Sequence, residues 1–482
     1  MPIVIPSVDW GPLVPVLLLP LAGFLVLLVD LVTPAGRKGV LALLALAGVV
    51  LSVVAAVAQR GVRALPFGGT LALDGFTTFF ILLIGAVAAL SILLAHPYLQ
   101  AERAEQGEYY ALVLFAAFGM VLMAASLELM TTFLGLETLS IALYIMAGYF
   151  RDRVRSTEAA LKYLLLGAFA SAFFLYGVAF IYGASGTTNL RRATAALAGQ
   201  EANPLLLLAM GLLIVGLGFK VALVPFHMWV PDVYQGAPTS VTAFMIAGTK
   251  AAAFAALLRI LTTVLAPLQA NWSQVLWVLA VCTMTLGNVV AISQRNIKRM
   301  LAYSSIAHAG YVLVAIVGGS AGYASVLFYL LAYALMNLGA FAVVIALERS
   351  GEEGLELGDY RGLGWRRPGL ALCMTLFMFA LAGIPPTSGF IGKLYIFSAA
   401  IQGQYIWLAI IGVLNSVVSA FYYLGVIVAM YMGERAEPTP HERLAPALVV
   451  ALLVAALGTL KLGLFPAWAI EIAQRSLAAL TG

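Results

Sequence analysis

Fourteen apolar stretches, each about as long as a transmembrane helix, take up most of this 482-residue chain. An α-helix rises about 1.5 Å per residue, so about 20 residues cross the roughly 30 Å hydrocarbon core of a bilayer. Since 63% of the residues are hydrophobic and only 10% are charged, we expect no soluble domain. The sequence predicts an all-α, polytopic membrane protein with helices over residues 12–33, 39–59, 76–98, 109–126, 127–149, 160–183, 204–226, 240–266, 273–293, 299–318, 322–347, 370–400, 407–431 and 445–467.

The residues between these stretches predict the orientation of the chain. The first stretch has no basic residue before it and no small-residue cleavage site, so we expect a retained helix and not a signal peptide. Lysine and arginine accumulate in cytoplasmic loops. One set of alternate loops holds fifteen of them: Arg37, Lys38, Arg103, Arg151, Arg153, Arg155, Arg295, Lys298, Arg299, Arg349, Arg361, Arg366, Arg367, Arg435 and Arg443. The opposite set, with the C-terminus, holds five: Arg60, Arg63, Arg191, Arg192 and Arg475. This bias predicts that both termini lie on the outer side.

No motif in the chain provides a ligand set for a cofactor or a metal ion. The two cysteines, Cys282 and Cys373, each lie alone in an apolar stretch, without a CxxC motif or a Cys/His cluster. We therefore expect no redox centre in this chain. The net charge of +5 follows from the loop residues and does not indicate a nucleic-acid partner.

Several ionisable residues lie within the predicted spans and not in the loops. Each such charge costs about 2.5–3.5 kcal/mol at the centre of a membrane helix, so it needs a partner, water or a neutral protonation state. Intramembrane ionisable residues commonly line ion pathways, although they can also be structural pairs that fix helix packing. Both interpretations stay open for Lys162, because Glu158 one turn earlier can pair with it. The candidates are Glu137, Lys162, Lys220, Lys250 and Lys393.

Two of the predicted helices contain residues that interrupt a helix. The stretch GFKVALVPFHMWVPDVYQGAPT holds three prolines, and LAGIPPTSGFIGK holds two adjacent prolines between glycines. A lysine lies near each break, Lys220 in the seventh helix and Lys393 in the twelfth. Discontinuous helices at corresponding positions of two halves indicate an inverted-repeat transporter site.

A weak similarity between residues 160–177 and 325–342 sets the spacing of these repeats at five helices. Because five is odd, the second copy must be inverted in the membrane. We therefore expect two inverted repeats, helices 4–8 and helices 9–13. The predicted parts of the chain are residues 1–108, 109–266, 273–431 and 445–482.

The motifs LGLETLSIALYIMAGY, LVPFHMWVPDVYQGAPTSVTAFM and GIPPTSGFIGK resemble the subunit N family of proton-pumping NADH–quinone oxidoreductase, respiratory complex I. The resemblance covers nearly the whole chain. A lysine and not a glutamate at the twelfth-helix break disfavours subunit M, and the end of the chain after helix fourteen disfavours subunit L. The alternatives are a subunit of an Mrp-type cation/proton antiporter and a passive scaffold.

The resemblance implies a role in proton transfer for six residues. Glu137 and Lys220 would form a pair, Lys250 would lie at the centre of a hydrophilic axis, and Lys393 would end it. A histidine in AYSSIAHAGYVLV would bridge the two halves, although a lone histidine in a helix is also often structural. The implied site residues are Glu137, Lys162, Lys220, Lys250, His308 and Lys393.

The resemblance also implies the surroundings of the chain. It would be a multi-pass protein of a bacterial inner membrane, where the lipid bilayer surrounds it and protons are its substrate. Its protein partners would be the antiporter-like subunit M and the small subunits K and J. NADH, FMN, iron–sulfur clusters and quinone would be bound by partner subunits and not by this chain.

Overall fold

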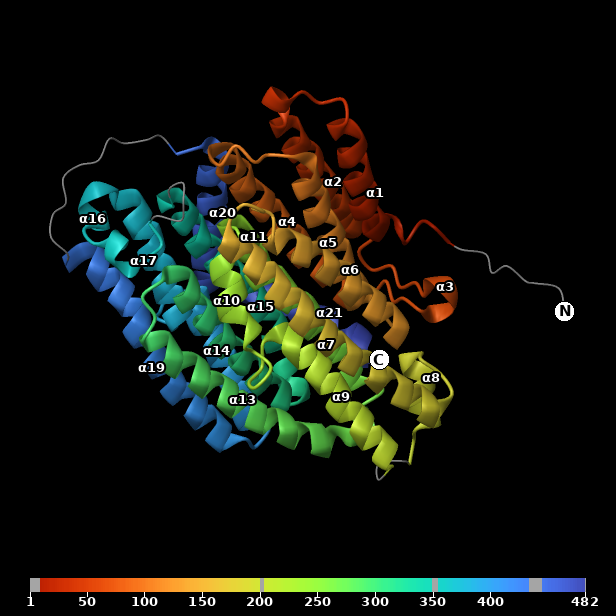
Figure 1. Ribbon diagram of the computed structural model, residues 1–482. Helices are drawn as coiled ribbons and strands as arrows, with labels where there is room; N and C mark the ends of the chain where they lie inside the picture. The colour runs from red at the N-terminus through yellow and green to blue at the C-terminus, as the bar shows by residue number, and fades with distance from the viewer. Residues whose placement is uncertain (1–8, 200–202, 349–353, 433–443, 482) are drawn as a thin grey trace.

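The apolar stretches form helices because a helix satisfies its own backbone hydrogen bonds, which lipid cannot do. A computed structural model describes residues 9–199, 203–348, 354–432 and 444–481 (Figure 1). Its helices are α1 (Val14–Asp30), η1 (Ala35–Arg37), α2 (Gly39–Ala58), α3 (Pro66–Gly69), α4 (Gly75–Ala101), α5 (Gly107–Ala125), α6 (Leu129–Ala147), α7 (Val154–Ser185), α8 (Leu190–Ala196), α9 (Pro204–Val221), α10 (Trp229–Gly236), α11 (Thr239–Phe244), η2 (Met245–Thr249), α12 (Lys250–Thr262), η3 (Ala266–Leu268), α13 (Gln269–Ile292), α14 (Ile297–Val317), α15 (Ser320–Leu347), η4 (Leu357–Tyr360), α16 (Leu363–Arg366), α17 (Pro368–Ala382), α18 (Ser388–Gln402), α19 (Ile406–Met432), α20 (Pro446–Leu464) and α21 (Ala467–Thr481).

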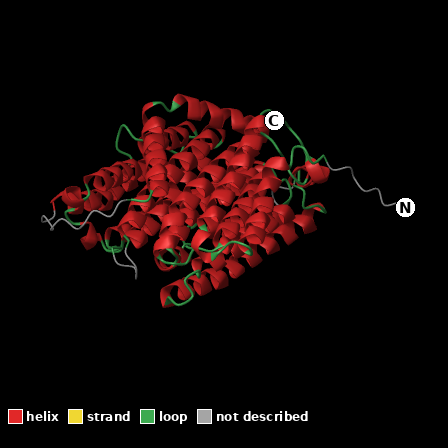
Figure 2. Cartoon of the chain, turned by 90° about the horizontal axis from the view of Figure 1, so that it is seen from above, coloured by secondary structure: helices red, strands yellow, loops and turns green. Residues whose placement is uncertain are grey.

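The prediction of an all-α membrane protein is confirmed. Among the described residues, 12 helices are long and apolar enough to cross a membrane, and the shorter apolar helices α1 and α17 complete the fourteen predicted spans. Figure 2 shows helices and loops, and strand pairing in the described part of the chain is limited to isolated β-bridges. The structure adds the C-terminal helix α21, which the sequence did not predict and which packs against α4 and α15.

The two predicted breaks are also present. Helix α9 ends at Val221, Ala222 takes the left-handed conformation with φ 68°, and α10 begins only at Trp229. Helix α17 ends at Ala382, Gly383 has φ 87°, and α18 begins at Ser388. In both places the prolines and the left-handed residue prevent the helix from continuing.

Helix burial separates the centre of the bundle from its lipid-facing rim. Within one apolar 18-residue window of each span, all residues of the segment formed by α11, η2 and α12 and 94% of those of α14 are buried, compared with 33% for α7 and α19. The outer helices expose large apolar side chains such as Phe169 and Phe421. A bilayer is an apolar solvent for such side chains, so the exposed faces of these outer helices suit contact with lipid.

Contacts between loops agree with the predicted alternation of the spans. A β-bridge joins Leu71, in the loop after α2, to Ser126 after α5. Another joins Asn296, after α13, to Glu356 after α15. Each bridge connects loops that the alternation places on one side of the membrane. Three of the loop arginines counted above, Arg349, Arg435 and Arg443, lie outside the described residues.

The neighbours of each helix recur in the two predicted repeats. In the first, α5 packs on α6 and α12; in the second, α13 packs on α14 and α19. In the numbering of the predicted spans, the fourth helix contacts the fifth and the eighth. The ninth helix, five spans later, contacts the tenth and the thirteenth. The division into two inverted repeats and the part boundaries stay predictions.

Candidate functional site

Lys250 lies at the centre of the bundle, directly after a change in helix geometry. The π-helical segment η2 ends at Thr249, and α12 begins at Lys250. A π turn widens the helix locally and is frequent at functional sites. The Lys250 ammonium donates a hydrogen bond to the backbone carbonyl of Ser305 on α14, and it lies 5.8 Å from the centroid of the Tyr333 ring. Lys220, Lys250 and Lys393 each expose 4% or less of their surface.

His308 lies one turn beyond that carbonyl and is buried between three helices. Its Nδ1 is 2.6 Å from the Tyr329 hydroxyl on α15, and its Nε2 is 3.0 Å from the Tyr423 hydroxyl on α19. The Tyr423 hydroxyl also forms a hydrogen bond with Ser304. Each ring nitrogen therefore faces a group that both donates and accepts protons, so the imidazole can take a proton on one side and release one on the other.

Lys393 uses the backbone groups that the break in the twelfth helix sets free. Its ammonium donates to the carbonyl oxygens of Leu381 at 3.1 Å and Ala382 at 2.9 Å, and to the Ser416 hydroxyl at 2.8 Å. These carbonyls are at the end of α17, where no later turn provides amide donors. The break therefore gives this buried lysine two carbonyl acceptors, and Ser416 on α19 provides a third.

Gly383 makes this arrangement possible. A Cβ at this position would lie 2.9 Å from Cδ of Lys393, and its φ of 87° is in the region that side chains disfavour. We expect Gly383→Ala to cost about 1–3 kcal/mol from backbone strain and to displace the ammonium from the carbonyls. The variant should melt at a lower temperature than the wild-type protein. Gly425→Ala is the control, because no atom lies within 4 Å of a Cβ there.

Lys220 and Glu137 lie near each other but are not in direct contact. The Lys220 ammonium donates to the Ser140 hydroxyl at 2.7 Å and to the Tyr163 hydroxyl at 3.1 Å. Glu137, one turn before Ser140 on α6, accepts a hydrogen bond from Ser171 and acts on Lys220 through space. In the described residues the two form no ion pair, so the pairing that the resemblance implies is indirect here.

Lys162 lies apart from the buried lysines Lys220, Lys250 and Lys393. Its side chain is 41% exposed and forms ion pairs with Glu158 and Asp232, each at 2.7 Å. Asp232 also binds Arg299 at 2.7 Å. The predicted contact with Glu158 is present. These exposed pairs link α7, α10 and α14 at the surface, near a cavity of about 160 Å³ that includes Gln235.

One helix connects the central and terminal lysines. Ser305, His308 and Tyr311 follow one another at intervals of three residues on α14, about 4.5 Å apart along the helix axis. The first accepts the hydrogen bond of Lys250, and the ring centroid of the third is 4.9 Å from the Lys393 ammonium. Lys250, His308 and Lys393 therefore form a continuous row along α14. Together with Lys220, these residues are called the buried row.

The aromatic residues of α7 and α10 join Lys220 to the same row. Tyr163, whose hydroxyl accepts from Lys220, stacks on Trp229 with ring centroids 4.5 Å apart. Trp229 in turn contacts Tyr234 at 5.9 Å, and the Tyr234 carbonyl accepts from Thr242 on α11. These contacts fix the distance between Lys220 and α11, which continues through η2 to Lys250.

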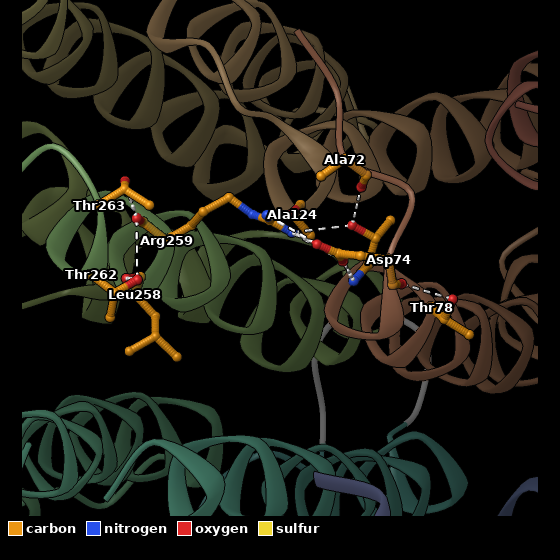
Figure 3. A network of polar contacts seen from close by, with 9 residues as sticks. Ala72, Asp74, Thr78, Ala124, Leu258, Arg259, Thr262 and Thr263 are labelled. Carbon is orange, nitrogen blue, oxygen red and sulfur yellow. Dashed lines mark hydrogen bonds and ion pairs between the residues drawn. The ribbon is translucent and has the colours of Figure 1, made fainter. Parts of the chain in front are cut away.

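A buried ion pair that the sequence reasoning missed lies near the other end of α12 (Figure 3). Arg259 contacts both carboxylate oxygens of Asp74 at 3.3–3.4 Å, and its Nε donates to the Ala124 carbonyl at 3.0 Å. Asp74 also caps α4 by accepting from the Thr77 amide at 2.8 Å. The presence of an arginine inside the predicted span 240–266 was a signal that could have found it. Lys461 on α20 was also missed; it is exposed and lies over Trp468.

The buried row suits proton transfer and not metal binding. Among the described residues, no group of three or more His, Cys, Asp and Glu side chains lies close enough to hold a metal ion. Lysine, histidine and tyrosine side chains each bind or release a single proton. An axis of such groups across the bundle can carry protons in single steps.

Comparisons with known proteins agree with this geometry. A family model described as NADH:quinone oxidoreductase/Mrp antiporter, TM, matches residues 126–419, more than half of the chain. Subunit N of the NADH-quinone oxidoreductase of Trichlorobacter lovleyi is 48% identical over 473 residues, which cover 98% of this chain and 97% of that protein.

Two solved structures show the same fold. A chain of respiratory complex I from Thermus thermophilus with bound aureothin is 38% identical, covers 95% of this chain and 99% of its own, and has a TM-score of 0.83. A chain of the Mrp complex from Dietzia sp. has a TM-score of 0.87 and covers 98% of this chain and 97% of its own, but at 23% identity this likeness shows the fold alone. The chain belongs to the subunit N family of NADH-quinone oxidoreductase, the antiporter-like, proton-translocating subunits in the membrane arm of respiratory complex I.

Proposed function

We propose that protons pass through this subunit along the buried residues Lys220, Lys250, His308 and Lys393. Protons enter from the cytoplasmic side toward Lys220 or Lys250, move laterally past His308, and leave from Lys393. Glu137 acts on Lys220, and Lys162 belongs to the cytoplasmic side, where the protons enter. The observation that carries this proposal is that Lys250 and Lys393 contact α14 one turn before and one turn after His308, at Ser305 and Tyr311.

The energy for this transfer comes from quinone reduction elsewhere in the complex. Moving one charge against the membrane potential costs about 2.3 kcal/mol per 100 mV. The free energy of protonating the lysines must therefore change by a similar amount in each cycle. Glu137 is suited to cause this change, because it acts on Lys220 through space and a shift of its carboxylate alters the field at the ammonium.

The proposal extends to the surroundings of the subunit, and the resemblance to the family supports it. We place it in a bacterial inner membrane with both termini outside, consistent with the loop charges. Subunits M, K and J are the proposed neighbours. NADH, FMN, iron–sulfur clusters and quinone belong to partner subunits, and no nucleic acid takes part.

Ion movement in membrane vesicles that contain the assembled complex tests this function. NADH addition should produce a pH gradient of the same size in sodium-containing and sodium-free buffer, because lysine and histidine side chains carry protons. Sodium-dependent proton movement without NADH would indicate an antiporter of the Mrp type instead. No change in pumping when the buried lysines are replaced would indicate a scaffold.

A further inference from the structure

Six buried side-chain oxygens in the described part of the chain form no hydrogen bond of ordinary length, and they lie on α11, η2 and α14, and on or directly after α15. They are those of Thr239, Thr249, Ser305, Tyr333, Asn337 and Glu348. Weaker interactions within this set pair Thr239 with Glu348 and Ser305 with Tyr333. A buried polar group that lacks a partner costs about 1–3 kcal/mol, so such groups in native proteins need an explanation, for example ordered water or a role in proton transfer. Their position on helices that pack against each other indicates a shared role.

Four of these six residues adjoin Lys250 or a residue that contacts it. Thr249 precedes it in the chain, and Ser305 provides the carbonyl that accepts its hydrogen bond. The ring of Tyr333 is 5.8 Å from its ammonium, and the Asn337 amide donates to the Tyr333 carbonyl at 2.9 Å. Lys250 therefore lies in a polar region inside an otherwise apolar bundle.

The other two oxygens lie at the end of α15, where Glu348 follows the last helical residue. The Tyr98 hydroxyl donates to Oε1 of Glu348 at 3.3 Å, and the Thr239 amide donates to the Tyr98 hydroxyl at 3.4 Å. Oε2 of Glu348 is buried, but the residue as a whole is partly exposed. Glu348 thus lies between the surface and the interior.

Two helices lead from this end of the bundle to Lys250. On α15, Asn337 lies about three turns, or ~16 Å, before Glu348 and on the same face. On the other side, α11 begins at Thr239, and η2 ends directly before Lys250. Because α15 packs against both α11 and η2, the two groups of oxygens are the two ends of one interface.

We propose that Glu348 takes up protons from the cytoplasmic side and passes them to Lys250 along the interface of α15 with α11 and η2. This inference rests on the proposed function and names the entrance that it requires. A proton from bulk water adds to the Glu348 carboxylate and gives the neutral acid. That proton then moves by way of water to the Lys250 amine, which becomes the ammonium, and the carboxylate forms again. No electron is transferred.

The charges around Glu348 suit a group that binds and releases protons. Burial raises the pKa of Glu348 above its ordinary value, and the nearby Glu102 adds to this effect. The Lys298 ammonium on α14 acts in the opposite direction. Among the described residues, Tyr98 from α4 and Tyr360 from η4 are also titratable groups that interact with it.

The test is NADH-driven proton pumping as a function of pH, in vesicles with the assembled complex carrying Glu348→Gln. The amide cannot hold a proton, so uptake then depends on bulk hydronium, whose concentration falls as the pH rises. We expect pumping at least about tenfold below wild type near about pH 8, with a smaller loss near about pH 6. Glu348→Asp should recover most of the wild-type profile. Glu105→Gln is the matched control, because Glu105 is a carboxylate bonded to Tyr110 at 2.6 Å in the loop after α4.

Two results would overturn the inference. One is a wild-type pH profile for Glu348→Gln. The other is an equal loss of pumping at every pH that Glu348→Asp does not repair, which indicates a structural role. Lys250→Ala in the same vesicles distinguishes the two failures. If only the inference about Glu348 is wrong, Lys250→Ala still loses pumping. If the proposed function is wrong, Lys250→Ala also pumps normally.

Discussion

Replacing Arg259 by methionine is expected to destabilise the subunit by about 3–5 kcal/mol, because Asp74 then keeps a buried carboxylate without its partner. Both side chains are almost completely shielded, with exposed fractions of 2% and 9%. The guanidinium also stacks on Phe76 and donates to the carbonyl of Ala124, so methionine removes contacts with both α4 and α5. The thermal midpoint and the yield of the assembled complex measure the effect.

The matched control for this prediction removes both charges. A double variant, Asp74→Asn with Arg259→Met, leaves no unpaired ion, and the asparagine can still cap α4 through Thr77. It should be clearly more stable than Arg259→Met alone. Equal stability of Arg259→Met and wild type would show that the ion pair in Figure 3 does not support the fold.

Lys250→Ala is expected to stop most proton pumping and to slow NADH-driven quinone reduction while the complex still assembles. Positioned proton-transfer groups contribute about 10²–10⁴-fold to rates, so the loss should be at least about a hundredfold if this lysine is an obligatory step. Alanine favours the helix and removes a costly buried ammonium, so the fold should be retained. Quinone reduction by NADH, compared with reduction of an artificial acceptor, measures the coupled loss.

Lys461→Ala is the control for that prediction. Lys461 is also a lysine of a membrane helix, but it is exposed on α20 and lies 5.0 Å from the Trp468 ring, outside the buried row. This variant should pump as wild type does. An equal loss from both variants would mean that removal of any intramembrane lysine disturbs the subunit.

The helices could be predicted from the sequence because membrane insertion depends on local properties. Length and hydrophobicity of a single stretch decide whether it can cross a bilayer, and proline with glycine decides where it breaks. The end of α17 at Ala382 and the left-handed Gly383 follow directly from the residues of LAGIPPTSGFIGK. Helix α21 was missed because it is amphipathic, with charges such as Glu471 and Arg475 among its apolar residues.

The contacts of the lysines could not be predicted, because they depend on which helices meet. The sequence identifies Lys393 as a costly residue, but its carbonyl partners become visible only when α18 packs against the end of α17. The sequence could name Glu158 as a partner for Lys162, but not Asp232. Only the tertiary structure shows that Lys162 is exposed in an ion-pair cluster and that Lys220 is buried.

The partner of Arg259 could not be predicted from the sequence either. Asp74 is 185 residues away in the chain and lies outside every predicted span. A buried arginine predicts that an acid must be near, but not which one. Glu348 was missed for a related reason, since a residue directly after a span is interpreted as a loop charge until its neighbours from α4 and α11 are known.

The most direct test of proton transfer through the buried row is the number of protons pumped per electron in vesicles with the assembled Lys250→Ala complex. Native gel electrophoresis and artificial-acceptor activity confirm that assembly and NADH oxidation are intact. If protons pass through Lys250, the ratio falls below that of wild type and residual quinone reduction is slow. A wild-type ratio at a wild-type rate, in a fully assembled complex, would contradict the relay and leave the buried lysines as structural residues.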